Sequence, residues 1–170
     1  MTDYETEYRK HELACGQPFP EIAKIFEKYD VTSARVLDLG CGQGRDALMI
    51  ASYGHRVHGV AVSPTGISQM IEQAKGKGTR VTGEVADNRK YKPTRKYNVV
   101  LLDRVIHMLD ASAEKEGLLK KAKSAVEKGG YVLIADIPSN MGIIEADFEK
   151  CQGWQVVFRN KSFRFYKKAV

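Results

Sequence analysis

The segment VLDLGCGQGRDAL, Val36–Leu48, combines a short apolar strand, a glycine-rich turn and the start of a helix. Three alternating glycines follow the strand directly, at Gly40, Gly42 and Gly44. Glycine permits a tight strand-to-helix turn and lets a ligand approach the backbone without a side-chain clash. The segment therefore predicts an α/β fold whose first strand leads into a ligand-binding loop.

Strand-like and helical patterns alternate over the rest of the chain. Apolar runs rich in Val, Ile and Leu predict four more strands, at 56–62, 79–87, 97–102 and 131–137. Because these runs are apolar on both parities, we expect strands buried on both faces, running parallel, with helices between them. The runs 154–159 and 162–168 alternate instead and predict a closing antiparallel hairpin. The predicted architecture is an open, mostly parallel sheet.

Capping residues predict where several helices begin and end. Ser63 suits the N-cap of a helix, and Pro64 suits its first position. The amphipathic helix at 112–130 is expected to stop at Gly129 and Gly130. A further short amphipathic helix is expected before the first strand, within PFPEIAKIFEKY. These boundaries support strand–helix–strand crossover units.

Composition restricts the class of protein. Of the 170 residues, 43% are hydrophobic and 28% charged, as in a globular protein with a substantial core. No apolar run approaches the roughly 20 residues of a membrane span, and the first residues are too polar for a secretory signal. Three cysteines without a C-x-x-C pair fit the reducing cytoplasm. We expect one domain over 1–170, with an N-terminal lid or helix in 1–30 and a core in 35–170.

The formal net charge of +6 raises the question of a nucleic-acid partner. Lysine and arginine gather in 75–96 and 159–168, and a basic surface attracts nucleic acid. Aromatic residues do not interleave with these basic residues as they do in an RNA-recognition sheet, so a solvated basic surface is the favoured interpretation. The four histidines lack metal-ligand spacing, and the sequence predicts no metal site.

Two cofactor classes use a glycine turn of this kind. A dinucleotide-binding turn has the pattern G-x-G-x-x-G, in which the third glycine packs the helix on the strand. Here the third glycine comes one position early and is followed by Arg45. That large side chain argues against a dinucleotide and against an NADP-linked oxidoreductase.

The pattern D-x-G-x-G-x-G, Asp38–Gly44, resembles motif I of the class I S-adenosylmethionine-dependent methyltransferases. The resemblance extends from Arg35 to Lys168 and is carried by HGVAVSPTGI, EVADNRKY, YNVVLLDRVIHML, LKKAKSAVEKGGYVLIAD and the closing hairpin. It implies a single-domain Rossmann-like fold and S-adenosylmethionine as the cofactor. The compact layout is similar to small members of the tellurite-resistance and thiol-methylating type.

The resemblance also implies which residues bind the cofactor. The glycine loop would line the methionine and ribose, and Asp38 would orient the amino group. Asp87 and Asn88 would meet the adenine edge, while Leu102 and Asp103 would lie beside the methionyl group. The whole implied set is Asp38, Gly40, Cys41, Gly42, Gly44, Ala61, Val62, Asp87, Asn88, Leu102 and Asp103.

Ala61 departs from the family pattern. Members of the family usually carry Asp or Glu at the end of the second strand, where the carboxylate accepts hydrogen bonds from both ribose hydroxyls. Two charge-assisted hydrogen bonds of roughly 1.5–3 kcal/mol each, partly offset by rehydration, correspond to an affinity loss of about 10- to 1000-fold. Ala61 is either an introduced substitution, which is the favoured interpretation, or a natural residue. In the second case the protein binds the cofactor by other contacts or does not bind it.

Residues after the fourth strand are candidates for acceptor chemistry. Methyl transfer is an in-line displacement that requires an aligned acceptor, and a hydroxyl acceptor needs a base whereas a thiolate does not. His107 is the candidate base, and Arg104 is the candidate partner of an anionic substrate. The alternatives are a partly buried histidine at a helix start and an arginine on the surface. Tyr4, Tyr8 and Arg9 are candidate lid contacts over the cofactor.

The resemblance predicts an S-adenosylmethionine-dependent methyltransferase that acts on a small molecule, with cofactor affinity weakened by Ala61. The fourth strand lacks the N-P-P-Y type of motif found in enzymes that methylate nucleic-acid amino groups, which favours a small-molecule acceptor. Two alternatives stay open: a non-catalytic binding protein with a methyltransferase fold, and a methyltransferase acting on RNA or protein. No membrane partner is expected, and no pattern indicates an oligomeric state.

Overall fold

The computed structural model describes residues 3–12, 14–27 and 33–170. It divides into two compact units, Met1–Asn88 and Arg89–Val170. Positions 1–2, 13 and 28–30 of the expected N-terminal segment lie outside the described residues. The single domain expected over 1–170 stays a prediction.

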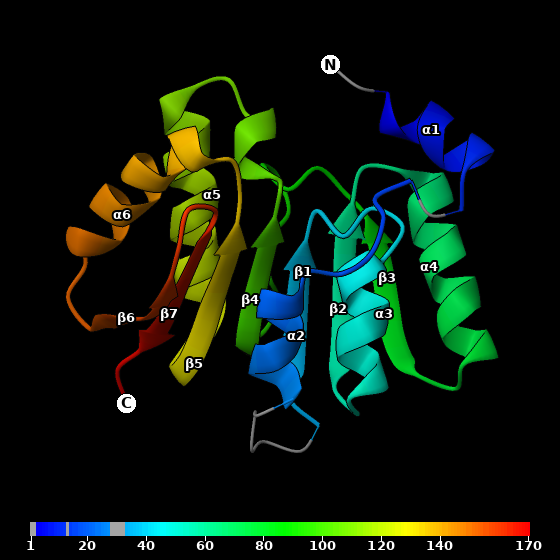
Figure 1. The fold of residues 1–170 in the computed structure, drawn as a ribbon, viewed down its shortest axis with the longest axis horizontal. Coiled ribbons are helices and arrows are strands. Elements are labelled where there is room, and N and C mark those ends of the chain that lie inside the picture. Colours follow the sequence, from blue (N-terminus) through cyan, green and yellow to red (C-terminus); the bar gives the residue numbers. More distant parts are fainter. Residues whose placement is uncertain (1–2, 13, 28–32) are drawn as a thin grey trace. The chain divides into compact units, whose positions relative to one another are not determined.

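Three parallel strands form the sheet of the first unit: β1 (Arg35–Leu39), β2 (Arg56–Ala61) and β3 (Arg80–Val85). Strand β2 pairs with both neighbours. The described residues of this unit also form the helices α1 (Tyr4–Lys10), α2 (Pro20–Glu27), α3 (Arg45–Ser52) and α4 (Pro64–Gly76). In Figure 1, α1 lies at the end of this sheet toward which the arrowheads of β1, β2 and β3 point. The carboxyl ends of the strands and α1 therefore share one edge of the unit.

Glycines allow helix α4 to pack closely on β2 and β3. Met70 of α4 is fully buried, and Gly59 of β2 lies opposite Gly83 of β3 in the parallel register. A Cβ atom added at Gly59 would lie 2.8 Å from Met70 Cε, and one added at Gly83 would lie 2.9 Å from it. At Gly44 the added Cβ would lie 2.7 Å from Met70 Sδ. These three glycines thus leave the space that one methionine fills.

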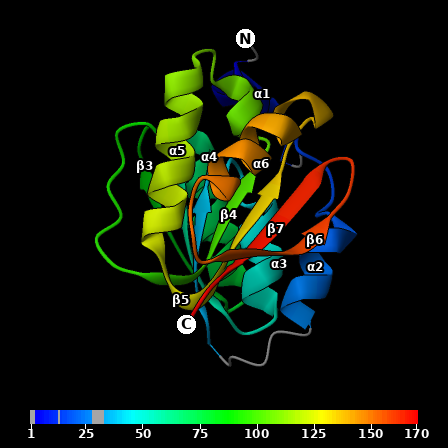
Figure 2. The same ribbon diagram turned by 90° about the vertical axis from the view of Figure 1, so that its left-hand side faces the viewer.

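Four strands form the sheet of the second unit: β4 (Tyr97–Asp103), β5 (Val126–Ala135), β6 (Trp154–Arg159) and β7 (Phe163–Lys168). Their order is β4-β5-β7-β6, with β4 and β5 parallel and the other pairs antiparallel. The unit also holds α5 (Ser112–Ala125), α6 (Met141–Glu149) and two short 3₁₀ helices, η1 (Ile106–Met108) and η2 (Pro138–Asn140). Figure 2 shows α5 and α6 side by side, and the two helices are in contact.

Aromatic rings join α6 to the C-terminal hairpin. The ring of Phe148 stacks on that of Tyr166, with 3.7 Å between centroids and an interplanar angle of 4°. Trp154 meets the same phenylalanine ring edge-on at 5.2 Å. Offset and edge-on aromatic pairs each add about 0.5–1.5 kcal/mol beyond the area that they bury. The hairpin is therefore anchored on its helix-facing side.

The predicted α/β class, with a mostly parallel sheet and an antiparallel C-terminal hairpin, is confirmed. Ser63 is the N-cap of α4, and its side chain accepts a hydrogen bond from Gly66 N, as predicted. None of the helices in the described ranges has both the length and the apolar character that a bilayer span requires.

The predicted end of the 112–130 helix is wrong. The helix ends at Ala125, and β5 begins at the next residue. A Cβ added at Gly130 would lie 2.5 Å from the carbonyl oxygen of Asn98 on β4, so this glycine allows close strand contact. Gly129, at φ 75°, sits in the irregular part of the ladder between β4 and β5. The two glycines shape a strand and do not end a helix.

Candidate functional site

In the glycine loop of the first unit, the backbone adopts at three positions a conformation that favours glycine. The φ angles are 91° at Gly40, 55° at Gly42 and 81° at Gly44, all in the left-handed region. Gly40 N and Cys41 N both donate to the carbonyl oxygen of Val60, at 2.7 and 3.1 Å, and so fix the loop to the end of β2. The loop backbone is therefore fixed at the end of β1, which it follows, and at the end of β2, to which it is hydrogen-bonded.

Asp38 lies in the strand directly before this loop. Its side chain is buried, with 2% of the residue exposed. Burial raises the pKa of this carboxyl well above its usual range; the nearby Asp46 raises it further, and Arg45 opposes the change. The Arg45 guanidinium is itself paired with Asp46 at 2.9 Å. A cation that arrived beside Asp38 would therefore favour its ionised form.

Apolar side chains are exposed where β2 and β3 end. Val62 follows β2 with 63% of its surface exposed, and Val85 ends β3 with 50% exposed. Ala61 is buried, and its carbonyl oxygen accepts from Ala86 N at 3.0 Å. Asp87 follows β3 and is half-buried. An exposed apolar surface beside a carboxylate suits a flat heterocycle with amino groups on its edge. Val85 was not among the residues predicted from the sequence.

Helix α1 places Tyr8 over the glycine loop. Tyr8 is 5% exposed, and its ring leaves no room for side chains on the glycines beneath it. A Cβ added at Gly42 would lie 3.2 Å from Tyr8 Cζ, and one added at Gly66 would lie 3.0 Å from Tyr8 Cδ2. The hydroxyl lies 3.6 Å from Cys15 Sγ. Burial, with that contact, raises the pKa of Tyr8, so its hydroxyl stays protonated.

Two glutamine side chains fasten the N-terminal segment to the loop. Gln43 donates to the carbonyl oxygen of His11 at 2.5 Å and accepts from Ala14 N at 3.0 Å. It also donates to Gln69 Oε1 at 2.8 Å, and Gln69 in turn donates to the carbonyl oxygen of Tyr8 at 2.9 Å. Neither glutamine was predicted as a site residue from the sequence, because no spacing rule marks them.

Glu5 brings a carboxylate to the N-terminus of α4. It accepts hydrogen bonds from Ser63 Oγ, from Thr65 Oγ1 at 2.5 Å and from Thr65 N at 3.3 Å. Arg9 lies 3.1 Å from the same carboxylate. Hydrogen bonds from Ser63 and then Thr65 lower the pKa of Glu5 to about 2. The group is anionic at ordinary pH, and the sequence analysis missed it.

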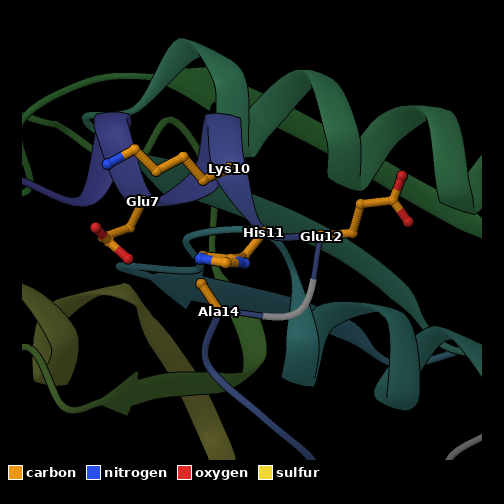
Figure 3. A pocket seen from close by; sticks show the side chains of 5 residues that line it. All are labelled: Glu7, Lys10, His11, Glu12 and Ala14. Atoms are coloured by element: carbon orange, nitrogen blue, oxygen red, sulfur yellow. The ribbon is translucent and has the colours of Figure 1, made fainter.

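An open pocket of about 590 Å³ lies on α1 and the segment that follows it (Figure 3). Its lining residues are Glu7, Lys10, His11, Glu12 and Ala14. Figure 3 shows Glu12 pointing away from His11 and Ala14. None of the predicted cofactor-binding residues lines this pocket. Across the described ranges, no group of His, Cys, Asp and Glu side chains could hold a metal ion.

In the second unit, β4 ends in a strained turn. Leu102 is fully buried and Asp103 is the last residue of the strand. Arg104 follows at φ 52°, a left-handed conformation that a non-glycine residue seldom adopts. Its N–H donates to the carbonyl oxygen of Ala135 at 2.7 Å, and its side chain is exposed. Strain of this kind is concentrated at functional sites.

His107, the candidate base, lies in η1 beside a buried carboxylate. Its Nδ1 atom is 3.6 Å from Asp136 Oδ2, with 28% of the histidine side chain exposed and none of the aspartate side chain. Asp136 also accepts from Ile106 N at 3.0 Å and from Asn140 Nδ2 at 2.7 Å. These donors hold the carboxylate in place at the end of β5. The sequence analysis missed Asp136, although the end of a predicted parallel strand is a place where such a group is expected.

The predicted residues thus fall into two groups. The first unit brings the glycine loop together with the ends of β2 and β3. The second unit has Leu102 and Asp103 at the end of β4, with Arg104 and His107 directly after it. The roles assigned to them stay predictions.

A family model described as a methyltransferase domain matches residues 30–167. A curated relative, the 2-heptyl-1-hydroxyquinolin-4(1H)-one methyltransferase of Mycobacteroides abscessus, is 44% identical over 75 residues. That alignment covers 44% of this chain and 33% of the relative, so the match spans about a third of the relative's length.

Solved methyltransferase structures share the fold. The N-methyltransferase NodS from Bradyrhizobium japonicum, in complex with S-adenosyl-L-homocysteine, superposes with a TM-score of 0.76 at 10% identity, covering 98% of this chain and 99% of NodS. A TehB-like S-adenosylmethionine-dependent methyltransferase from Corynebacterium glutamicum gives 0.75 at 18% identity, covering 98% and 96%. At these identities the likeness shows the Rossmann-like methyltransferase fold.

Proposed function

The chain belongs to the methyltransferase-domain family, and we propose that it is a class I S-adenosylmethionine-dependent methyltransferase that methylates a small molecule through an ionisable hydroxyl. The observation that carries this proposal is the 44% identical relative, whose name describes methylation of a hydroxyquinolone. The cytoplasmic location expected from the cysteines stays a prediction.

The first unit is suited to the cofactor. The left-handed turn at Gly40, Gly42 and Gly44 carries the loop backbone past the carboxyl ends of β1 and β2, where a ligand would meet it. The buried Asp38 would bind the amino group of the methionine moiety, and Val62 with Val85 would cover the adenine. When bound, S-adenosylmethionine supplies the electrophilic methyl group.

His107 is proposed to take the proton of the acceptor hydroxyl. Its Nδ1 faces Asp136 Oδ2, so the tautomer with a proton on Nδ1 leaves Nε2 free to accept another proton. The carboxylate then stabilises the imidazolium that forms. The 3.6 Å separation is longer than a hydrogen bond, and such contacts often tighten when substrate binds. Arg104 would pair with an anionic part of the acceptor.

The test is calorimetric titration of S-adenosylmethionine and S-adenosylhomocysteine, followed by product detection with a panel of acceptors. The panel contains a 1-hydroxyquinolin-4-one, a thiol and an RNA oligonucleotide. We expect cofactor binding, its loss in Asp38→Asn but not in the exposed control Asp110→Asn, and methylation of the hydroxyquinolone. Methylation of RNA alone would favour the nucleic-acid alternative. Absence of cofactor binding, also in Ala61→Asp, would leave the non-catalytic binding protein.

A further inference from the structure

We propose that Glu5 is the carboxylate that binds the cofactor's ribose hydroxyls in this chain, in place of the acid that Ala61 lacks. The inference rests on the proposed cofactor site. It assigns a ligand-binding role to a residue of α1, and it explains how a chain with Ala61 can keep a usable site.

Glu5 reaches the end of β2 through its contacts on α4. Its carboxylate accepts from Ser63 Oγ and from Thr65 Oγ1, and both residues follow Ala61 closely in the turn that opens α4. The same turn lies against the glycine loop, because a Cβ added at Gly66 would lie 2.7 Å from the carbonyl oxygen of Gly42. The carboxylate is thus held beside the edge where the family's strand-end acid is placed.

The pattern of hydrogen bonds on Glu5 matches the chemistry of a diol. Oε2 accepts from the hydroxyl of Ser63, and Oε1 accepts from the hydroxyl of Thr65, one hydroxyl on each oxygen. An ionised carboxylate offers about four acceptor sites over its two oxygens and can bind a two-pronged donor. The neighbouring hydroxyls of a ribose present the same pair of donors. Exchanging the protein hydroxyls for ribose hydroxyls conserves the number of hydrogen bonds that the carboxylate accepts, while the hydroxyls of Ser63 and Thr65 turn to solvent.

The carboxylate also has the charge and the access that the role requires. The hydrogen bonds from Ser63 and Thr65 keep it anionic, and 27% of its side chain is exposed, so a ligand can reach it. Arg9, at 3.1 Å, balances its charge without burying it. A partly exposed anionic acceptor of this kind differs from Asp136, whose side chain has no exposed surface.

Helix α1 holds Glu5 and the glycine loop in one arrangement. Tyr8 packs on Gly42, and Gln43 of the loop binds the backbone of His11 at the end of the helix. The loop and the carboxylate are therefore positioned by the same contacts. Capping of α4 by itself does not require the contacts that Tyr8 and His11 make with the glycine loop.

A ligand pair separates ribose binding from a purely structural role. We would titrate S-adenosylhomocysteine and its 2′-deoxy analogue into the unmodified chain, Glu5→Gln and the control Glu7→Gln. We expect Glu5→Gln to weaken S-adenosylhomocysteine about 10- to 100-fold, in line with the loss of charge-assisted hydrogen bonds. The 2′-deoxy analogue should lose clearly less, and Glu7→Gln should change neither affinity.

A second comparison uses the empty strand position. Adding Ala61→Asp to Glu5→Gln should restore most of the affinity for S-adenosylhomocysteine, whereas Ala61→Asp alone should gain little. Equal losses for both ligands, without restoration, would show a structural latch and overturn the inference. Unchanged binding by Glu5→Gln would also overturn it while leaving the proposed function intact. If the unmodified chain binds neither ligand, the proposed function fails and the inference falls with it.

Discussion

Replacement of Met70 by alanine is expected to destabilise the first unit strongly. The side chain is fully buried and contacts positions where Gly44, Gly59 and Gly83 have no Cβ. Methionine-to-alanine changes in cores cost about 2–5 kcal/mol, and more when the surroundings cannot collapse into the cavity. Three glycines on strands and a tight turn leave little side-chain material to move inward. We therefore expect Met70→Ala to lie in the upper half, about 3–5 kcal/mol.

The measurement is urea unfolding followed by circular dichroism, with Met49→Ala as the control. Met49, on α3, is only partly buried, so its truncation should cost clearly less. For a chain of this size each kcal/mol lowers Tm by about 2–4 °C, so Met70→Ala should melt roughly 6–20 °C lower.

A second substitution tests whether the glycines exist to admit this methionine. In the unmodified chain a Cβ at Gly83 would lie 2.9 Å from Met70 Cε and 3.0 Å from Ile67 Cγ2, so Gly83→Ala should destabilise. In the Met70→Ala background the first of these contacts is gone, and Gly83→Ala should cost less. A loss below about 1 kcal/mol for Met70→Ala, or the same cost of Gly83→Ala in both backgrounds, would refute this account of the packing.

Three further predictions concern titration and catalysis. Because burial raises the pKa of Asp38, binding of a cofactor ammonium should release a proton. Calorimetry in buffers of different ionisation enthalpy checks this, and a binding enthalpy that is the same in every buffer would contradict it. His107→Gln should slow methylation of a hydroxyl acceptor by about 10²- to 10⁴-fold and spare a thiolate, which a comparison of kcat for the two acceptors checks. Burial lowers the pKa of His55 from 6.5, so its stabilising effect is present above that pH and lost as the pH falls through the folded-state pKa. His55→Leu should flatten that part of the unfolding free-energy profile, and an unchanged slope would contradict the assignment.

Most of the fold could be predicted because its signals are local. The strand around Asp38 is apolar on both sides and runs straight into three glycines, and Ser63 with Pro64 opens α4 as its types require. The hairpin alternates in polarity and turns at Asn160, whose side chain accepts from Ser162 N and Phe163 N at 2.9 Å. Each of these features is decided by neighbours in the chain.

The end of α5 could not be predicted from local signals because its glycines have two valid interpretations. Paired glycines after a lysine-rich helix are typical of a helix end, and the same residues suit a strand that approaches another backbone closely. The carbonyl oxygen of Asn98 decides between them, since it lies where a Cβ of Gly130 would be. That contact joins β5 to β4 and is absent from the local sequence.

The helix α1, with the sequence YETEYRK, also depends on contacts that are distant in the chain. Its only local signal is Asp3, whose side chain accepts from Thr6 N at the start of the helix. A helix this short is marginal in water by itself. The helix is further stabilised by packing of Tyr8 on the glycine loop and by the hydrogen bonds of Glu5 to α4. A polar seven-residue pattern does not predict these contacts.

At the end of β2, Ala61 stands where the family usually has Asp or Glu. Comparison of that position alone therefore indicates that the carboxylate acceptor for the ribose hydroxyls is missing. Hydrogen-bond recognition requires an acceptor at a place in space, and the chain can supply it from any element that reaches that place. Under the proposed role of Glu5, cofactor affinity depends on the fraction of molecules in which α1 is docked, since apparent affinity falls in proportion to that fraction. Gln43 and Gln69, which hydrogen-bond to the backbone carbonyls of His11 and Tyr8, would then tune binding through α1. A strand-end aspartate removes that dependence, and this is why Ala61→Asp separates a weakened site from one whose affinity is set by its N-terminal helix.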